Sequence, residues 1–465
     1  MSQPPAALIR ALHHAASHLA GLDQRSVAAT ASLESLRQRL NVTWGQAGAP
    51  AEQVIDDLVA ATAGGHLGSA SGRFFAWVIG GSLPSALAAD WLTSTWDQNA
   101  GMYACAPAAS VVEEVCGAWL KDLFGLPIGA SFALTTGCQL AHFTALAAAR
   151  HAVLRAAGWD VEQRGLFGAP PIRVLVNQDR HGSIDRAVAF LGLGRDALKV
   201  LPLDDDGRLG AATLAAGLAE GEGPAIVVLQ AGDLNIGAFD DFEALVPIAR
   251  ATGAWTHVDG AFGLWARASE RFAPLVRGVE LADSWATDGH KWLNVPYDSG
   301  LAFVRDTAAH RAAMTHAASY LTADGQARDA LDWTPEFSRR ARGFAIWAAL
   351  RELGRGGVAD LVERCCDHAE ALARGVGMLS GAVRLPSALN QAIVAFEDPR
   401  PGATSADHDA RTNAVIAAIN DSGEAFFSGT TWRGRRAMRI SVSNWRTDAG
   451  HVARAVAAVA AALLV

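Results

Sequence analysis

Lys291 lies where its side-chain amine could react with a carbonyl group. It follows the strand-like run 283–287 and precedes a second such run, 300–304, so we expect it on the tight connection between two strands. A lysine amine ordinarily titrates near ~10.4 and attacks a carbonyl only when it is unprotonated. A dry pocket built partly by His290 and Trp292 would favour this neutral form. The residue types therefore predict covalent amine chemistry at position 291.

Polar side chains follow four strand-like runs of the chain. His181 follows the run 172–176, and Asp233 and Asn235 follow the run 225–229. Asp259 follows the run 254–258, and Lys291 follows the run 283–287. Continuous apolar strands that alternate with helices indicate a parallel or mixed sheet covered on both faces. In such sheets ligands bind beyond the carboxyl ends of the strands. We therefore expect these five side chains at one rim of the sheet. The strands are expected at 172–176, 225–229 and 254–258, with helices at 184–193 and 242–252.

The residues at this rim suit a flat, charged cofactor. Asp259 could pair with a protonated ring nitrogen, and such an ion pair keeps a pyridine cationic, so that the ring can accept electrons. His181 could stack on the ring or carry a proton near neutral pH. The segment 135–139 precedes an alanine-rich helix, whose first amides and dipole favour a phosphate, although an ordinary helix cap explains that segment equally well by itself. Together, a lysine, a carboxylate, an imidazole and an anion-ready helix start describe a pyridoxal phosphate site.

The chain resembles the group II pyridoxal-phosphate-dependent decarboxylases, which act on aromatic amino acids, histidine or glutamate. The resemblance runs from about residue 73 to residue 356 and is strongest in 288–292, 257–261, 181–187 and 237–240. It implies an α/β architecture of the aspartate aminotransferase type (fold type I). A large domain with a mixed, mostly parallel sheet covered by helices is expected at 86–353, a small C-terminal α+β domain at 354–465, and an N-terminal helical segment at 1–85.

The resemblance also implies roles for individual residues. Lys291 would form the Schiff base with pyridoxal 5'-phosphate, Asp259 would hold the pyridine nitrogen, and His181 and Ala261 would lie on the two faces of the ring. Lys291, His181 and Asp259 would thus be the catalytic residues of an L-amino acid decarboxylase that releases the corresponding amine. Further cofactor contacts are implied for Gly137, Cys138, Gln139, Asp288, His290 and Asn235.

Three departures from the family pattern leave the outcome open. Many relatives carry two threonines after the glycine of the second strand's loop, where this chain has Gly232-Asp233-Leu234-Asn235. An acidic Asp233 near the cofactor would change the charge preference for substrate or the protonation of the ring. Cys138 and Gln139 replace the usual small or hydroxyl residues of the phosphate turn. Ala330 aligns with a loop tyrosine that, in relatives, returns a proton to the decarboxylated carbon.

The alanine at position 330 permits two outcomes. Tyr320 or His181 could donate the proton instead, or the reaction could end in oxidative deamination and give an aldehyde. An aminotransferase and a non-enzymatic binding or regulatory subunit are further alternatives. Trp77 and Tyr103 could line a substrate pocket or simply fill cores. The pocket interpretation slightly favours an aromatic or bulky apolar amino acid as substrate.

The composition excludes several classes of partner. A net charge of -8, with 18% charged and 51% hydrophobic residues, is not typical of a chain that binds nucleic acid or a membrane surface. The five cysteines form neither an even disulfide framework nor a spaced metal quartet, so we expect a cytoplasmic protein without a metal site. Because the N-terminal helices are too thin to bury their apolar faces alone, we expect a homodimer, and the resemblance implies active sites shared between its chains.

Overall fold

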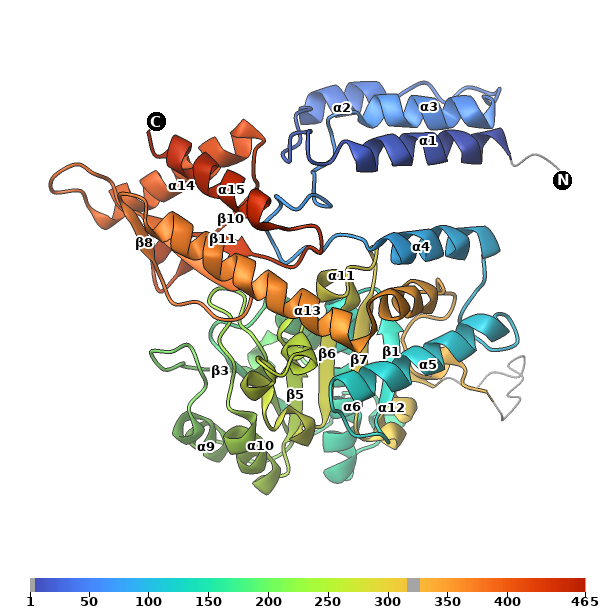
Figure 1. Ribbon diagram of the computed structural model, residues 1–465. Coiled ribbons are helices and arrows are strands. Elements are labelled where there is room, and N and C mark those ends of the chain that lie inside the picture. Colours follow the sequence, from blue (N-terminus) through green and yellow to red (C-terminus); the bar gives the residue numbers. More distant parts are fainter. Residues whose placement is uncertain (1–4, 316–326, 465) are drawn as a thin grey trace. The chain divides into compact units, whose positions relative to one another are not determined.

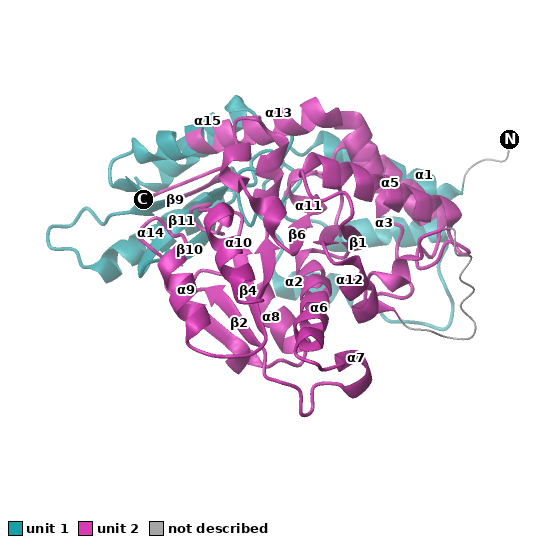
Figure 2. Ribbon diagram, turned by 90° about the horizontal axis from the view of Figure 1, so that it is seen from below, with its two compact units in different colours: residues 1–79, 371–384, 394–465 teal, residues 80–370, 385–393 magenta. Residues whose placement is uncertain are grey.

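The computed structural model describes residues 5–315 and 327–464. Figure 1 labels its helices and strands. The chain divides into two compact units, coloured separately in Figure 2. The larger consists of residues 80–370 and 385–393, and the smaller of residues 1–79, 371–384 and 394–465. The expected domain boundaries near residues 85 and 353 stay predictions.

A seven-stranded sheet forms the centre of the larger unit. Its strands are β1 (Ser131–Thr135), β2 (Arg173–Asn177), β3 (Leu198–Leu201), β4 (Ala225–Gln230), β5 (Trp255–Asp259), β6 (Ser284–Asp288) and β7 (Gly300–Val304). Their order across the sheet is β1-β7-β6-β5-β4-β2-β3. The strands from β6 to β3 pair in parallel, whereas β7 runs antiparallel to both of its neighbours. The expected mixed, mostly parallel sheet is confirmed.

Helices cover both faces of this sheet. On one face α6 (Cys138–Ala156), α8 (Gly182–Phe190) and α12 (Thr307–Met314) pack on apolar side chains that include Val174 and Val176. Leu175 alternates with these two valines, so its side chain points to the opposite face. There Gly217 of α9 (Ala211–Ala219) lies against Leu175, and α10 (Phe242–Ala251) contacts α9.

The remaining helices of the larger unit connect and flank these layers. They are α4 (Pro84–Trp96), α5 (Pro107–Leu123), α7 (Val161–Arg164), α11 (Gly289–Trp292) and the first part of α13 (Gly343–Gly377), with short 3₁₀ turns at Arg195–Ala197, Gly263–Ala268, Ala273–Val276, Val279–Leu281 and Ala330–Asp332. The helix α13 is kinked at Gly354, whose φ of 61° places it in the left-handed region that glycine tolerates. Gly354 is also the residue at which the sequence predicted that the small C-terminal domain begins.

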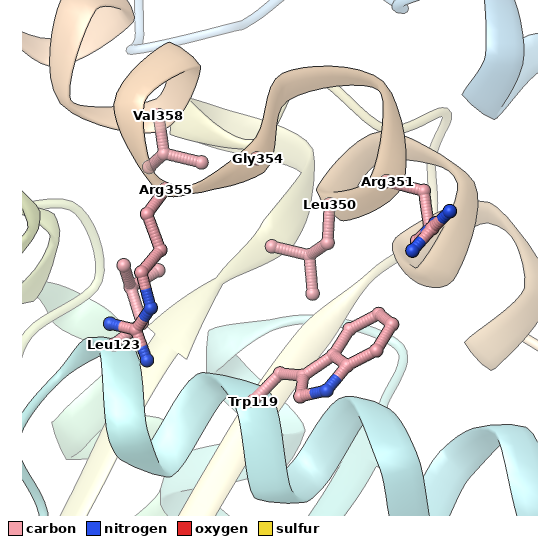
Figure 3. Close-up of a pocket in the computed structure, with 7 residues that line it drawn as sticks. All are labelled: Trp119, Leu123, Leu350, Arg351, Gly354, Arg355 and Val358. Carbon is pink, nitrogen blue, oxygen red and sulfur yellow. The ribbon is translucent and has the colours of Figure 1, made fainter.

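A cavity of about 220 Å³ lies between α5 and α13 in the larger unit, as Figure 3 shows. Its lining residues are Trp119, Leu123, Leu350, Arg351, Gly354, Arg355 and Val358. None of the side chains predicted to bind a cofactor lines this cavity.

The smaller unit combines helices with a four-stranded sheet. Its elements are α1 (Ala6–Ala20), α2 (Leu33–Leu40), α3 (Ala51–Thr62), the end of α13, β8 (Ala382–Arg384), β9 (Gln391–Phe396), α14 (Ser405–Ser422), β10 (Ser428–Trp432), β11 (Arg435–Ser441) and α15 (Ala449–Ala462). Residues 391–393 of β9 are counted with the larger unit. The sheet order is β10-β11-β9-β8, with antiparallel β10–β11 and β8–β9 pairs. The expected small C-terminal sheet and N-terminal helices are confirmed. Within the described part of the chain, no helix combines the length and apolar character needed to cross a bilayer.

Candidate active site

Lys291 lies in α11, a single helical turn between the antiparallel strands β6 and β7. Its Nζ is 3.1 Å from Oδ2 of Asp288, the last residue of β6. Asn294 follows the turn with a φ of 51°, and its side-chain Oδ1 accepts a hydrogen bond from the amide of Gly81 at 2.8 Å. A Cβ atom at Gly80 would collide with the carbonyl oxygen of Lys291, so only glycine allows this close approach. The backbone around Lys291 is therefore fixed by its contacts with Gly80 and Gly81.

The ring of His290 has a fixed orientation beside this lysine. It stacks on Tyr297 with ring centroids 4.2 Å apart, and its Nδ1 accepts the amide proton of Ser299 at 3.2 Å. Burial lowers the pKa of His290, so the ring is neutral and carries its proton on Nε2. That nitrogen is 3.5 Å from Oδ1 of Asp288. His290 is thus placed as a donor toward an acceptor at the end of β6.

The start of α6 is the segment for which the sequence suggested an anion-binding turn. Gly137 precedes the helix with a φ of 154°, and the amide of Cys138 donates to Oδ1 of Asp288 at 2.6 Å. The side-chain Nε2 of Gln139 is buried and has no hydrogen-bond partner within residues 5–315 and 327–464. A carboxylate already occupies one amide here, and an unpaired donor lies in the same turn. These residues fit a phosphate group, whose oxygens accept hydrogen bonds.

Asp259 ends β5 and is ionised. Only 5% of its surface is exposed, its Oδ1 accepts the amide proton of Ala261 at 3.2 Å, and Nε2 of His142 lies 3.5 Å from the same oxygen. Burial by itself raises the pKa of a carboxyl group, but the opposing influence of His142, His181 and Lys291 holds the pKa of Asp259 well below its usual range. The carboxylate can therefore pair with a cationic ring nitrogen.

The charge of Lys291 differs from the expectation drawn from sequence. Burial lowers the pKa of Lys291, as expected, but the carboxylates of Asp288 and Asp259 raise it more, and the net pKa lies above its ordinary value. In the cofactor-free protein the amine is therefore an ammonium group paired with Asp288. The prediction of a neutral amine was wrong because it considered the dryness of the pocket and not the acidic residue one helical turn before the lysine.

Only one lysine of the chain lies at this rim. The sequence contains three, Lys121, Lys199 and Lys291. Lys121 donates to the backbone carbonyls of Ile128 and Ala130, and Lys199 pairs with Glu220. Because both are occupied elsewhere, Lys291 is the one amine that can attack a carbonyl at the ends of β5 and β6.

His181 and Ala261 follow the strands that the sequence indicated. His181 is exposed and caps α8, where its Nδ1 lies 3.2 Å from the amide of Ser183. The carbonyl of Ala261 accepts hydrogen bonds from the amide of Asp288 at 3.1 Å and from the hydroxyl of Thr287 at 3.3 Å, which ties the end of β5 to the end of β6. Their placement on the two faces of a cofactor ring stays a prediction.

Asp233 organises its own loop. Its Oδ1 accepts the amide proton of Asn235 at 2.8 Å and its Oδ2 that of Ala238 at 2.8 Å, and both oxygens lie 3.3 Å from the amide of Ile236. Only 2% of the surface of Asp233 is exposed, and its carboxylate accepts hydrogen bonds from backbone amides of its own loop. This geometry argues against the suggested effect of Asp233 on substrate charge. Asn235 is buried in the same loop, and its contact with the cofactor stays a prediction.

The two aromatic residues suggested for a substrate pocket belong to different units. Trp77 contacts Phe74 and Phe426 within the smaller unit, and Tyr103 lies in the larger unit. Their shared pocket therefore stays a prediction. Ala330, which aligns with the loop tyrosine of relatives, is buried in the 3₁₀ turn Ala330–Asp332. Tyr320, the alternative proton donor, lies outside the described residues.

Sequence reasoning missed two histidines at the site. His142 of α6 and His257 of β5 are both completely buried, with His142 Nδ1 2.9 Å from His257 Nε2. Cys138, His142 and Asp259 also form a group of metal-ligand type, with their ligand atoms within 4.8 Å of one another, although no metal site was expected. A signal existed, because residues 138 and 142 share a helix face and residues 257 and 259 share a strand face. The sequence did not show that these two faces meet.

Comparison with known proteins agrees with this arrangement. Residues 34–397 match the family model described as the pyridoxal-dependent decarboxylase conserved domain. The L-2,4-diaminobutyrate decarboxylase of Rhizobium meliloti is 31% identical over 392 residues, which cover 80% of this chain and 74% of the relative. The aromatic-L-amino-acid decarboxylase of Bacillus atrophaeus is 26% identical over 389 residues, which cover 81% of this chain and 78% of the relative.

Solved structures share the fold at lower sequence identity. The tryptophan decarboxylase structure from Oryza sativa, which contains pyridoxal phosphate and tryptamine, superposes with a TM-score of 0.92 at 22% identity and covers 100% of this chain and 99% of that one. The 4-hydroxyphenylacetaldehyde synthase of Rhodiola rosea gives a TM-score of 0.86 at 21% identity, covering 98% of this chain and 97% of that one. By the extent of the family match and the 31% identity to a curated relative, this chain belongs to the pyridoxal-phosphate-dependent amino acid decarboxylases, and pyridoxal 5'-phosphate is its cofactor.

Proposed function

We propose that this chain converts an L-amino acid with an aromatic or bulky apolar side chain into the corresponding amine, with Lys291 as the residue that binds the cofactor covalently. The observation that carries the proposal is the position of the Lys291 amine among the ends of β5 and β6 and the start of α6. Pyridoxal phosphate supplies an electron-accepting ring that stabilises the electrons left behind when carbon dioxide departs.

Each protein group then has a physical task. Asp259, ionised and buried, keeps a proton on the ring nitrogen by offering it a fixed negative charge. The first amides of α6 and the unpaired Nε2 of Gln139 hold the phosphate. Nε2 of His290, which lies 3.5 Å from Oδ1 of Asp288, adds a donor beside this turn. His181 and Ala261 are proposed to lie against the two faces of the ring. Held at the phosphate, at the ring nitrogen and on both faces, the cofactor would have one fixed orientation toward the substrate.

An aldehyde-forming reaction is the second candidate. Ala330 carries no proton donor at the position where relatives have a tyrosine, and the aldehyde synthase of Rhodiola rosea shares this fold. In that reaction oxygen takes two electrons and two protons from the decarboxylated substrate and becomes hydrogen peroxide. Water then hydrolyses the oxidised product to ammonia and an aldehyde.

A homodimer in the cytoplasm is also proposed. In support of a dimer, none of the residues of α1, α2 and α3, all of which are described, is buried.

A panel of L-amino acids tests both candidates. The relatives are named for an aromatic amino acid, a diamino acid and a sulfinic amino acid as substrates. The panel therefore needs aromatic, basic, acidic and branched amino acids. Products are identified by mass spectrometry with and without oxygen. Carbon dioxide and an amine in equal amounts support the first candidate, and aldehyde, ammonia and peroxide that require oxygen support the second. Exchange with a keto acid without release of carbon dioxide would contradict both.

The close contact between Gly300 and the phosphate turn yields a testable prediction. A Cβ atom at position 300 would collide with three backbone atoms of Gly137, so Gly300→Ala must displace the turn. Overpacking of this kind costs about 1–3 kcal/mol. We therefore expect the dissociation constant of the cofactor to rise about 5- to 150-fold in an absorbance titration. Gly129→Ala, where a Cβ meets nothing within 4 Å, serves as control. An unchanged constant in Gly300→Ala would contradict the assigned position of the phosphate.

The ion pair at Lys291 predicts how cofactor capture depends on pH. Asp288 raises the pKa of Lys291, and the protonated amine present below that pKa cannot attack the aldehyde. The attachment rate at saturating cofactor should therefore rise with pH. In Asp288→Asn the pKa falls, so the rate at neutral pH should increase on the order of tenfold, measured by stopped-flow absorbance. Asp241→Asn, which affects the cap of α10, is the control. If Asp288→Asn and the wild type gave the same pH profile, the proposed control of the amine by this carboxylate would be wrong.

A further inference from the structure

A line of buried polar side chains lies behind Asp259. Trp255, His257 and Asp259 alternate along β5, so all three point to the face of the sheet that α6 covers. Ser284 of β6 is paired with His257 in the sheet register. His142 is a buried residue of α6. His142, His257 and Ser284 have no exposed surface, and Trp255 is 8% exposed. Polar groups buried this deeply need partners, because an unpaired one costs about 1–3 kcal/mol.

These side chains form one continuous series of contacts. Trp255 Nε1 donates to Ser284 Oγ at 2.8 Å, and Ser284 Oγ lies 2.9 Å from His257 Nδ1. His257 Nε2 lies 2.9 Å from His142 Nδ1. The second nitrogen of His142, Nε2, lies 3.5 Å from Asp259 Oδ1. The series thus starts at an indole and ends at the carboxylate proposed to hold the ring nitrogen.

The two ends determine where every proton lies. The indole of Trp255 can only donate, and an ionised carboxylate such as that of Asp259 can only accept. Ser284 therefore receives the indole proton and passes its own hydroxyl proton to His257 Nδ1. His257 then donates from Nε2 to Nδ1 of His142. The last proton, on Nε2 of His142, points to Asp259.

This direction is the one that satisfies every group. His257 remains neutral with its proton on Nε2, in agreement with burial, which lowers the pKa of His257 well below its usual value. His142 accepts a hydrogen bond at Nδ1 and donates one from Nε2. In the opposite direction Ser284 would receive two N–H groups, and its hydroxyl proton would have no acceptor among the contacts of the described chain. A lone pair of His142 would then face the carboxylate of Asp259.

Cys138 does not compete for the carboxylate. Its Sγ lies 3.3 Å from His142 Nε2, and burial raises the pKa of the thiol well above its usual value, so the sulfur is neutral. A neutral thiol is a weak acceptor, whereas the ionised oxygen of Asp259 is a strong one. The proton on Nε2 of His142 is therefore directed to Asp259.

We propose that His142 is a positioning residue that, supported by His257, Ser284 and Trp255, donates a hydrogen bond to Asp259 and fixes its carboxylate in the ionised form and orientation needed at the cofactor's ring nitrogen. The proposal rests on the proposed function of Asp259. His142 itself touches neither substrate nor cofactor in this role. Residues that hydrogen-bond to a ligand-binding side chain and so orient it typically contribute about 10- to 100-fold to affinity or activity.

The first test uses the cofactor-free protein and needs no activity. Long-range ¹H–¹⁵N spectra of the histidine side chains, assigned with His142→Gln and His257→Gln, report which nitrogen of each ring carries a proton. We expect both rings to be neutral with the proton on Nε2. A proton on Nδ1 of either ring, or a doubly protonated His142 at neutral pH, overturns the proposed direction.

The second test compares a variant that preserves the contacts with one that removes them. The amide of glutamine offers one acceptor and one donor, as the neutral imidazole does, whereas leucine offers neither. We expect His142→Leu to lower the turnover number about 10- to 100-fold with little change in KM, and His142→Gln to recover most of this loss. His151→Gln is the matched control, because His151 lies on the same helix but pairs with Glu162.

The third readout is the ¹⁵N chemical shift of the ring nitrogen in protein loaded with labelled pyridoxal phosphate. It should indicate a protonated nitrogen in the wild type and in His142→Gln, and a loss of that proton in His142→Leu. If His142→Leu kept both the shift and the turnover of the wild type, the inference would fail while the proposed function stood. If wild-type protein bound no pyridoxal phosphate, the proposed function would fail, and the histidine spectra of the cofactor-free protein would still decide the direction of the protons.

Discussion

We expect Lys291→Ala to abolish turnover, with a loss of at least about 10⁴-fold in the release of carbon dioxide, because no other amine can replace it at the site. The two other lysines of the chain are engaged elsewhere, Lys121 with backbone carbonyls and Lys199 with Glu220. The variant should also lose the visible absorbance that a cofactor bound to a lysine gives. Both quantities are measured on purified protein with saturating pyridoxal phosphate.

Lys199→Ala is the matched control for this variant. It removes an amine of the same kind from a partly exposed ion pair, and such pairs contribute about 0–1 kcal/mol to stability. Its absorbance and turnover should equal those of the wild type. Substantial turnover in Lys291→Ala, or a comparable loss in Lys199→Ala, would show that the covalent role was assigned to the wrong residue.

The second large effect is expected for Asp259→Asn. The asparagine has a similar shape but no charge, so it cannot hold a proton on the ring nitrogen by electrostatic attraction. Removal of one partner from a buried charged pair costs about 2–5 kcal/mol. We therefore expect the turnover number to fall roughly 30- to 5,000-fold. Cofactor attached to Lys291 should still form, because the attacking amine remains.

This retained attachment separates the two roles. In Asp259→Asn the absorbance should be present while turnover is lost, whereas in Lys291→Ala both should be lost. The ¹⁵N shift of the labelled ring should indicate an unprotonated nitrogen in Asp259→Asn. Turnover at the wild-type level in this variant would contradict the assigned function of the carboxylate.

The sequence predicted the positions that follow directly from buried strands. The apolar runs before Asp259 and Lys291 correspond to β5 and β6, and the polar residues after them lie at the strand ends. The strand β1 was not predicted, because it is polar at both ends, at Ser131 and Thr135. The strand β1 forms because it pairs with the antiparallel strand β7, and this pairing cannot be inferred from the residues of β1 alone.

Other features of the site depend on contacts between distant segments. The charge of Lys291 is determined by an acidic neighbour whose proximity requires the helical turn α11. The carboxylate of Asp233 serves the amides of its own loop, which only the loop conformation reveals. The link between His142 and His257 joins residues 115 positions apart, on a helix and a strand. Sequence spacing alone carries no information about such packing.

The most direct measurement of the central claim is the site of cofactor attachment. Wild-type protein is incubated with pyridoxal phosphate, reduced with borohydride, digested and mapped by mass spectrometry, so that the reduced bond marks the lysine that held the cofactor. The account predicts one modified peptide, which contains Lys291, in an amount that approaches one cofactor per chain. Modification confined to Lys121 or Lys199, or no modification at saturating cofactor, would contradict it.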